Sequence, residues 1–479
     1  MTSLPRIAPS SVGIDPAAVH ALADRLGRNH AHSFMILRHG QVAAEAWYAP
    51  YGPSYTHFMY SLSKSFTSTA IGLACAEGVL SLTTRIAELF ADELDAPPCP
   101  NMAMVTIRDL LMMACGHKEE PKIVWEDHWA RHFIETFDPR IPGVETPAED
   151  LFCYNSFGTF MLSASITKVT GQSVFEYLKP RLLDPLGITD VSFEENADGI
   201  SMGGWGFNLH TEDVAKFGQL LLQDGVWEGK RLLPEGWVAE ATAWQISTKN
   251  RHGHKDWKQG YCYQYWRNTF PNSYRCDGLW GQFAIVLPDQ DMVVAMTNGT
   301  EETQETLDAV WEELMPGVAD ALVADPKADE ELAAYLKTLS IAPVSGTKKN
   351  FSGTAYFGDN ALDIRQITFT LSENGEDCIR IARGKGELAV TAGAGCWVPG
   401  HSVCGDPFMS TGGTLFYDDW HASGAFREDG TYELTLQYHR TPYAAHFLFT
   451  FYEGCVKMDW KPYPNRETVK PVSVYGRLL

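Results

Sequence analysis

The chain lacks the features that define several classes of protein. No apolar run approaches the roughly 18 residues that a membrane-spanning helix needs, and the first residues do not combine a basic segment with an apolar one. Basic residues are also few, because 38 Lys and Arg stand against 60 Asp and Glu, and the resulting net charge of −22 repels phosphate backbones and anionic lipid surfaces. We therefore expect a cytoplasmic protein that binds neither nucleic acid nor membrane.

The ten cysteines form no Cys-x-x-Cys pair, which argues against a zinc knuckle or a redox dithiol, and we expect neither metal nor cofactor. The remaining composition is that of a globular protein, with 45% hydrophobic, 12% aromatic and 20% charged residues. A chain of 479 residues has room for two or three domains of about 100–200 residues each. A small disulfide scaffold and a wholly disordered chain are both excluded.

Apolar β-forming segments occur in two pairs that lie far apart in the chain. Residues 33–38 and 42–48 flank a turn that contains Gly40, and residues 281–287 and 292–297 flank a turn that contains Pro288. Each pair predicts a hairpin, and both hairpins fit one buried sheet. Helical patterns occupy residues 15–26, 65–77, 107–114, 157–169, 173–183, 211–223 and 303–314. A helical region is therefore expected between the two halves of a sheet.

The last third of the chain has a different pattern. Residues 316–349 are rich in Ala, Asp and Lys and contain one further helical pattern, whereas the chain from residue 351 onward alternates polar and apolar residues between turns. We predict a first domain over residues 1–316, a linker with a short helix over 317–349, and an all-β domain over 350–479. No repeat with a period of about 20–50 residues is present, which argues against a solenoid or a propeller.

Ser61 and Lys64 form a Ser-x-x-Lys pair, which on a helix places an amine beside a hydroxyl on one face. The same spacing recurs at Ser165 and Ser345, so the surroundings must decide among the three copies. Ser61 stands where a loop enters a helix of small and apolar residues, and a helix N-terminus offers a free N–H to an oxyanion. Ser165 lies in the middle of a helix pattern and Ser345 in the linker, so Ser61 is the candidate nucleophile. The alternative is an ordinary helix start with a lysine in its first turn.

A second polar group, Tyr154-Asn155-Ser156, is enclosed by apolar residues just before a helix pattern. This is what a phenol and an amide directed into a site would look like, although a buried tyrosine at a helix start would give the same pattern. Together with the first motif it suggests that Ser61 attacks a carbonyl while Lys64 and Tyr154 share the proton.

The arrangement resembles the serine β-lactamase and penicillin-binding group, most closely its class C-like esterase and amidase branch, over about residues 10–315. The segments that carry the resemblance are Tyr60-Ser-Leu-Ser-Lys-Ser-Phe-Thr-Ser68, Tyr154-Asn-Ser156, the strand from Tyr274 to Phe283, and residues 203–213 and 225–234. The resemblance implies an α/β fold with an antiparallel sheet flanked by helices and a helical region, which the C-terminal all-β domain then follows.

The resemblance also implies the site. The family's third motif, Lys-Thr-Gly, is absent, and Cys276-Asp277-Gly278 stands in its place on the edge strand. The N–H groups of Ser61 and Leu279 then form the oxyanion hole. Ser156, Cys276, Asp277, Gly278 and Trp280 are the expected substrate-binding residues, with Ser156 in place of the usual Asn. Because the motif's Lys is missing and Asp277 adds the opposite charge, weak or no β-lactamase activity is expected.

Two further motifs compete with this interpretation. Gly199-Ile-Ser201-Met-Gly203 matches the nucleophile elbow of α/β-hydrolases, but no apolar strand precedes it and no helix follows. His128 and His132 have a zinc-compatible spacing, but the Glu of a zincin is missing. The leading hypothesis is a metal-free serine hydrolase that forms an acyl-enzyme on Ser61 and acts on a small ester, amide or D-peptide. An acyltransferase on the same site and a non-catalytic binding protein remain alternatives, and a homo-oligomer is compatible with the sequence.

Overall fold

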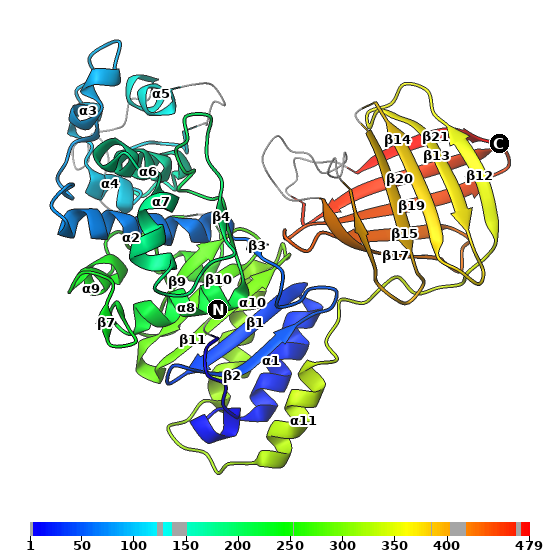
Figure 1. Cartoon of the computed structure of the whole chain (residues 1–479), viewed down its shortest axis with the longest axis horizontal. Helices are drawn as coiled ribbons and strands as arrows, with labels where there is room; N and C mark the ends of the chain where they lie inside the picture. Colours follow the sequence, from blue (N-terminus) through cyan, green and yellow to red (C-terminus); the bar gives the residue numbers. More distant parts are fainter. Residues whose placement is uncertain are drawn as a thin grey trace.

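The structure is a computed structural model. It describes residues 3–121, 128–136, 151–251, 253–384, 386–402, 418–465 and 471–479, and Cys404 lies outside these ranges. The molecule consists of a sheet flanked by helices, a helical region beside that sheet, and a second sheet formed by the last third of the chain (Figure 1). Among the described helices, none is long and apolar enough to cross a membrane.

The first sheet has six strands in the order β2-β1-β11-β10-β9-β8. Their bounds are β1 (Ala31–Arg38), β2 (Gln41–Trp47), β8 (Trp266–Arg267), β9 (Tyr274–Gly278), β10 (Gln282–Leu287) and β11 (Met292–Asn298). β1 pairs antiparallel with β11, and Met35 lies opposite Ala295. The prediction that both hairpins share one sheet is therefore confirmed.

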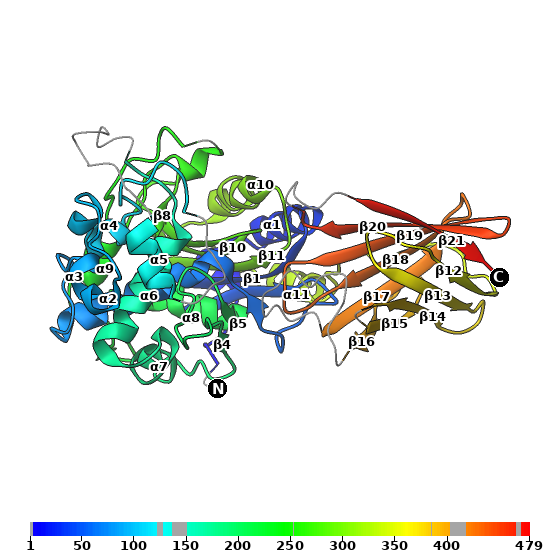
Figure 2. The same ribbon diagram turned by 90° about the horizontal axis from the view of Figure 1, so that it is seen from above.

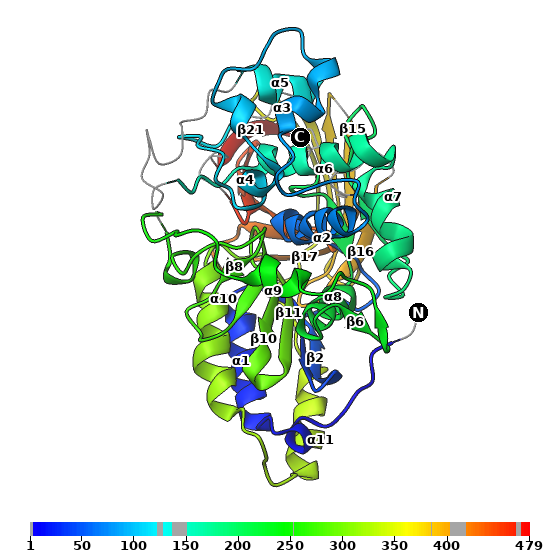
Figure 3. The ribbon, with the colours of Figure 1, turned by 90° about the vertical axis from the view of Figure 1, so that its left-hand side faces the viewer.

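Helices cover both faces of this sheet, because successive side chains of a strand point to opposite sides. Phe34 and Ile36 of β1 pack in one core with α1 (Pro16–Arg28), α10 (Thr303–Ala309) and α11 (Pro326–Leu336). Met35 and Leu37 join the opposite core, which includes α2 (Ser63–Ala76) and α8 (Thr211–Leu222). Figure 3 shows α10 and α1 on one side of β10 and α8 on the other. Burial on both faces explains why the strand sequences are continuously apolar.

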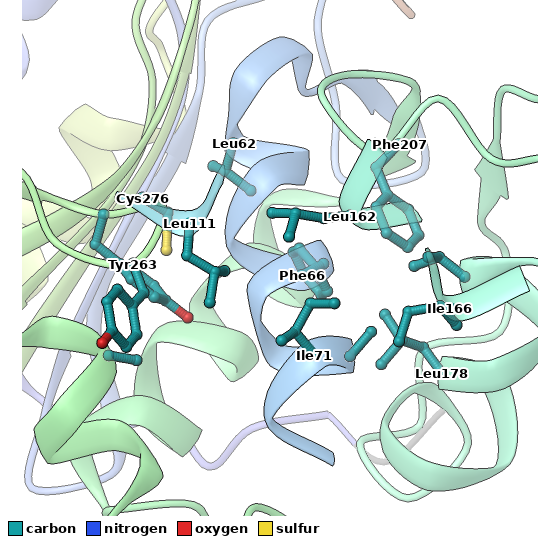
Figure 4. Close-up of a cluster of buried hydrophobic side chains, with 14 of the residues drawn as sticks. Leu62, Phe66, Ile71, Leu111, Leu162, Ile166, Leu178, Phe207, Tyr263 and Cys276 are labelled. Carbon is teal, nitrogen blue, oxygen red and sulfur yellow. The ribbon is translucent and has the colours of Figure 1, made fainter. Parts of the chain in front are cut away.

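The helical region lies beyond one face of the sheet. It contains α3 (Ile86–Leu89), α4 (Ile107–Leu111), α5 (Trp129–Thr136), α6 (Ser156–Thr170), α7 (Val174–Leu178) with a π-helical turn over Lys179–Leu183, and α9 (Trp237–Thr242). α2 runs through its centre, and Figure 4 shows Phe66 and Ile71 of α2 close to Leu162 and Ile166 of α6. A small sheet of β3 (His57–Phe58), β5 (Phe207–Leu209) and β4 (Ser192–Phe193) lies beside α2.

The second sheet has ten strands in the order β15-β14-β13-β12-β21-β20-β19-β18-β17-β16, and Figure 2 shows it beside the first sheet. The bounds are β12 (Phe351–Tyr356), β13 (Ile364–Leu371), β14 (Asp377–Arg383), β15 (Gly386–Ala392), β16 (Val398–His401), β17 (Asp419–Phe426), β18 (Tyr432–Gln437), β19 (Ala444–Tyr452), β20 (Cys455–Tyr463) and β21 (Val472–Leu478). It encloses its own hydrophobic core, as the alternating pattern predicts.

The C-terminal sheet meets the rest of the molecule near the start of α2. The N–H of Phe58 in β3 donates to the carbonyl of Arg440 at 2.9 Å, in the turn between β18 and β19. Ahead of the second sheet, Leu332 and Leu336 of α11 are buried against the core that contains α1. The helix expected in the linker is therefore part of the packing around the first sheet.

Candidate active site

Ser61 lies in a 3-10 turn over Tyr60–Leu62 that leads directly into α2, so the helical structure begins five residues before the expected start at Ser65. α2 is buried along most of its length, and the hydroxyls of Ser63, Ser65 and Thr67 bond to neighbouring segments. Ser63 Oγ accepts from the N–H of Phe207 at 3.1 Å, and Thr67 Oγ1 donates to the carbonyl of Gly203 at 2.9 Å. Small polar residues therefore let this helix be buried and fixed at the same time.

Lys64 is 2% exposed and lies at the centre of the site. Its Nζ donates to Ser61 Oγ at 3.1 Å, to Ser156 Oγ at 3.2 Å and to the carbonyl of Gly204 at 2.7 Å. Burial lowers the pKa of the ammonium from its usual value near 10.5 to about 7, against the opposing effect of Glu120 and Asp277. A large fraction of Lys64 is then a neutral amine at neutral pH, beside the Ser61 hydroxyl.

Tyr154 lies on the other side of this amine, since Lys64 Nζ stands 4.9 Å from the centre of the phenol ring. Burial raises the pKa of the Tyr154 phenol, and a hydrogen bond with Ser61 acts in the opposite direction. The phenol is therefore protonated at neutral pH. Lys64 and Tyr154 are the two groups expected to share the proton. Of these, Lys64 has the pKa that is shifted toward neutral pH, which favours Lys64 as the base.

Asn155 does not point into the site, so the interpretation of this residue as a site amide is wrong. The residue is 1% exposed, and its Oδ1 accepts from the N–H of Gly158 at 2.7 Å as the N-cap of α6. Ser156, half-buried, holds the position beside Lys64, and its own N–H donates to Glu120 Oε1 at 2.8 Å.

β9 forms the opposite edge of the site. Its backbone passes so close to the turn before Ser61 that a Cβ on Gly278 would lie 2.2 Å from the carbonyl oxygen of Met59, and glycine is needed there for that reason. Asp277 lines the cavity and is paired with Arg275, whose Nε donates to its Oδ2 at 2.8 Å. Burial raises the pKa of the Asp277 carboxyl, while Arg275 acts to lower it.

Cys276 was expected among the substrate-binding residues, but its side chain is fully buried in the core around α2 (Figure 4). Neighbouring residues of a strand face opposite sides, so Asp277 on the cavity side places Cys276 on the core side. The thiol is thus directed away from the cavity.

These groups surround a cavity of about 610 Å³. Its lining residues are Tyr60, Ser61, Glu120, Tyr154, Ser156, Trp205, Arg251, Gly253, His254, Trp257, Trp266, Asp277, Gly278, Leu279, Trp280 and Thr303. The structure therefore brings together seven of the site residues expected from the sequence, namely Ser61, Tyr154, Ser156, Asp277, Gly278, Leu279 and Trp280, with Lys64 directly behind Ser61.

The competing motifs lie elsewhere. Ser201 is fully buried and its Oγ accepts from the N–H of Phe175 at 3.3 Å, so it is not presented to a substrate. Ser165 Oγ donates to the carbonyl of Met161 at 2.7 Å within α6. Within the described ranges, no three His, Cys, Asp or Glu side chains are grouped as metal ligands, His128 and His132 included.

Sequence reasoning did not single out several residues of the site. Glu120 belongs to no recognisable motif, and Arg251 lies in a cationic loop that has an ordinary surface pattern. Arg251 stacks over Tyr154 and Trp266, 5.3 Å and 4.7 Å from the ring centres. The carbonyls of Gly203 and Gly204 accept hydrogen bonds from Thr67 and Lys64, and the sequence marks this segment only through its family resemblance. Each of these residues comes from a segment distant in sequence, so no local spacing reports it.

Comparison with known proteins identifies the class to which this fold and site belong. A family model described as Beta-lactamase matches residues 21–314, and the chain belongs to this family. A 6-aminohexanoate-dimer hydrolase of Paenarthrobacter ureafaciens is 25% identical over 235 residues, which are 46% of this chain; the chain spans 59% of the length of that relative.

Solved structures are also similar to the chain at low sequence identity. SurE is similar with a TM-score of 0.51 and 17% identity over 89% of this chain and 97% of its own, so the likeness extends across both sheets. A class C beta lactamase of Rhodobacter sphaeroides matches with a TM-score of 0.49 and 14% identity, over 63% of this chain and 99% of its own.

Proposed function

We propose that the chain is a serine hydrolase that forms an acyl-enzyme on Ser61 and hydrolyses a small ester, amide or D-peptide. The observation that carries this proposal is the contact of Lys64 Nζ with Ser61 Oγ at 3.1 Å, together with burial that lowers the Lys64 pKa to about 7. A buried amine that is partly neutral at neutral pH is a competent base for a serine hydroxyl.

The steps follow from the placement of the groups. Lys64 takes the hydroxyl proton as Ser61 Oγ bonds to the acyl carbon, and the N–H groups of Ser61 and Leu279 stabilise the oxyanion. Tyr154 donates its phenolic proton to the leaving group and regains one from Lys64, after which the leaving group departs. Water then attacks the acyl-enzyme by the reverse sequence, with the proton returned to Ser61. A different acceptor in place of water gives the acyltransferase alternative.

The substrate class is narrowed by what surrounds the nucleophile. Four tryptophans, Trp205, Trp257, Trp266 and Trp280, line the cavity and provide an apolar wall for an acyl or aromatic group. Cys276 stands in the place of the family's lysine, and Asp277, paired with Arg275, adds a negative charge beside it, which supports weak or no β-lactamase activity. The similarity to a 6-aminohexanoate-dimer hydrolase supports the proposal that amides, as well as esters, are substrates.

We further propose that the catalytic domain spans residues 1–316 and that residues 317–349, whose helix α11 packs against that domain, connect it to an all-β domain over 350–479. We also propose that the protein is cytoplasmic. The nine free thiols of the described residues support a reducing compartment.

Replacement of the nucleophile tests the proposal. Ser61→Ala is expected to lower the turnover of an activated ester such as p-nitrophenyl acetate by about 10⁴-fold or more, because the covalent step is lost. Ser165→Ala, in the second Ser-x-x-Lys copy, is the matched control and should keep full turnover. Activity that persists in Ser61→Ala would show that another residue is the nucleophile.

A further inference from the structure

Two aromatic residues next to the proposed oxyanion hole have an unusual backbone conformation. Tyr60 directly precedes Ser61, and Trp280 directly follows Leu279; their φ angles are +46° and +64°. Bulky residues other than glycine rarely occupy this left-handed region, and they stay there only where the surrounding structure holds them. Something must therefore hold the two turns that present the Ser61 and Leu279 N–H groups.

One hydroxyl group of the second sheet contacts both of these residues. Tyr60 Oη donates to Tyr443 Oη at 2.8 Å, and Trp280 Nε1 donates to the same oxygen at 3.3 Å. A phenolic oxygen can accept two hydrogen bonds, so a single atom can join the two turns. The rings of Trp280 and Tyr443 also meet edge to face, with their centres 6.4 Å apart.

The turn that carries Tyr443 is itself fixed to the first part of the molecule. It connects β18 to β19, where the N–H of Tyr438 donates to the carbonyl of Tyr443 and the N–H of Tyr443 donates to Thr441 Oγ1, both at 3.1 Å. Backbone atoms on either side of the turn hold it in place. Arg440 accepts the Phe58 N–H at 2.9 Å, and Gly299 lies so close to Pro442 that a Cβ there would be 2.3 Å from its carbonyl oxygen.

We propose that Tyr443 is a positioning residue of the active site and that the C-terminal sheet supplies it. Its hydroxyl holds Tyr60 and Trp280, and through their backbones it sets the separation of the Ser61 and Leu279 N–H groups that bind the oxyanion. This inference rests on the proposed function, and it gives the C-terminal domain a part in catalysis without contact with the substrate.

The test is Tyr443→Phe in the full-length chain, which keeps the ring and removes only the shared oxygen. The proposal predicts a fall in kcat of about 10- to 100-fold with KM within about twofold, because the oxyanion forms only after substrate binds. The rate of Ser61 labelling by a fluorophosphonate should fall by a similar factor. Tyr475→Phe is the control, because this tyrosine of the same sheet is 63% exposed, and it should behave as wild type.

A double variant separates positioning from simple domain docking. Tyr60→Phe removes one donor to Tyr443, so adding it to Tyr443→Phe should cost little more than Tyr443→Phe alone. A Tyr443→Phe protein with a lowered unfolding temperature but unchanged kcat and labelling rate would overturn the inference while leaving the proposed function intact. Wild-type protein that gains no fluorophosphonate adduct on Ser61 would overturn the proposed function and this inference with it.

Discussion

Lys64 illustrates how a single residue acquires a chemical role from its surroundings. The ammonium is almost fully buried, and its three hydrogen-bond acceptors, two hydroxyls and one carbonyl, are all uncharged. Burial without a directly bonded carboxylate disfavours the charged form, and the pKa falls to about 7. The sequence spacing of Ser61 and Lys64 predicts their contact, but the lowered pKa depends on the burial that the fold supplies.

The pH dependence of the reaction should report this group. If neutral Lys64 is the base, kcat/KM for an activated ester should rise with pH through an apparent pKa near 7, because protonated Lys64 cannot accept the Ser61 proton. Below that pH the rate should fall about tenfold per unit. Lys64→Arg keeps a cation that does not deprotonate, and it should lose activity at every pH tested. A flat wild-type profile between pH 5.5 and 8.5 would remove Lys64 from the proton transfer.

At the scale of elements, the site depends on the close approach of β9 to the turn before α2. Gly278 allows this approach, since any side chain would collide with the Met59 carbonyl. The Met59 carbonyl is a backbone group and cannot move aside as the end of a flexible side chain can. If a side chain is added at Gly278, β9 and the turn before α2 must therefore move apart.

Gly278→Ala should therefore widen the site. We expect a loss of about 10²-fold or more in kcat/KM for an activated ester, together with a lower unfolding temperature, because Ser61 and Leu279 move apart. Gly358→Ala is the control, because a Cβ at Gly358 has no atom within 4 Å, and it should leave both quantities unchanged. Full activity in Gly278→Ala would show that the separation of the two elements does not limit the reaction.

The elements that the sequence predicts best are those with a clear apolar pattern. The two hairpins, α1 and α8 were each located within a few residues because burial on one or both faces leaves a regular signal. The start of α2 was placed too late, since the Tyr60–Leu62 turn has no such signal. Asn155 was misread because a helix cap and a site amide have the same sequence. Glu120 and Arg251 reach the site, and Tyr443 reaches Tyr60 and Trp280 beside it, only through tertiary folding.

At the scale of the whole molecule, the junction with the C-terminal sheet contains two pairs of histidines, of which His32, His57 and His439 are buried. His57 Nδ1 bonds the carbonyl of Phe58 at 3.2 Å, so this nitrogen carries the proton, and His57 Nε2 accepts from His32 Nδ1 at 3.0 Å. His439 Nε2 lies 2.8 Å from His421 Nδ1. Burial lowers the pKa of His57 to about 3 and, with the neighbouring His421, that of His439 to about 4.

Acid should therefore weaken the fold. In the unfolded chain His57 and His439 bind protons below about pH 6.5, whereas in the folded chain these two stay neutral until about pH 3–4, so the free energy of unfolding should fall as pH drops from 6.5 toward 4. The loss should be of the order of a few kcal/mol, measurable by urea unfolding at pH 7.5 and 4.5. His57→Gln should reduce this pH dependence, and exposed His20→Gln should not. An unfolding free energy that does not change between the two pH values would contradict this account of the junction.

The most direct test of the central claim is peptide mass spectrometry after treatment with a fluorophosphonate, which modifies a serine activated by a base and an oxyanion hole. The account predicts one adduct, on the peptide that contains Ser61, and none in Ser61→Ala. A folded protein without an adduct would favour a non-catalytic binding protein, and an adduct on Ser201 would contradict the assigned site.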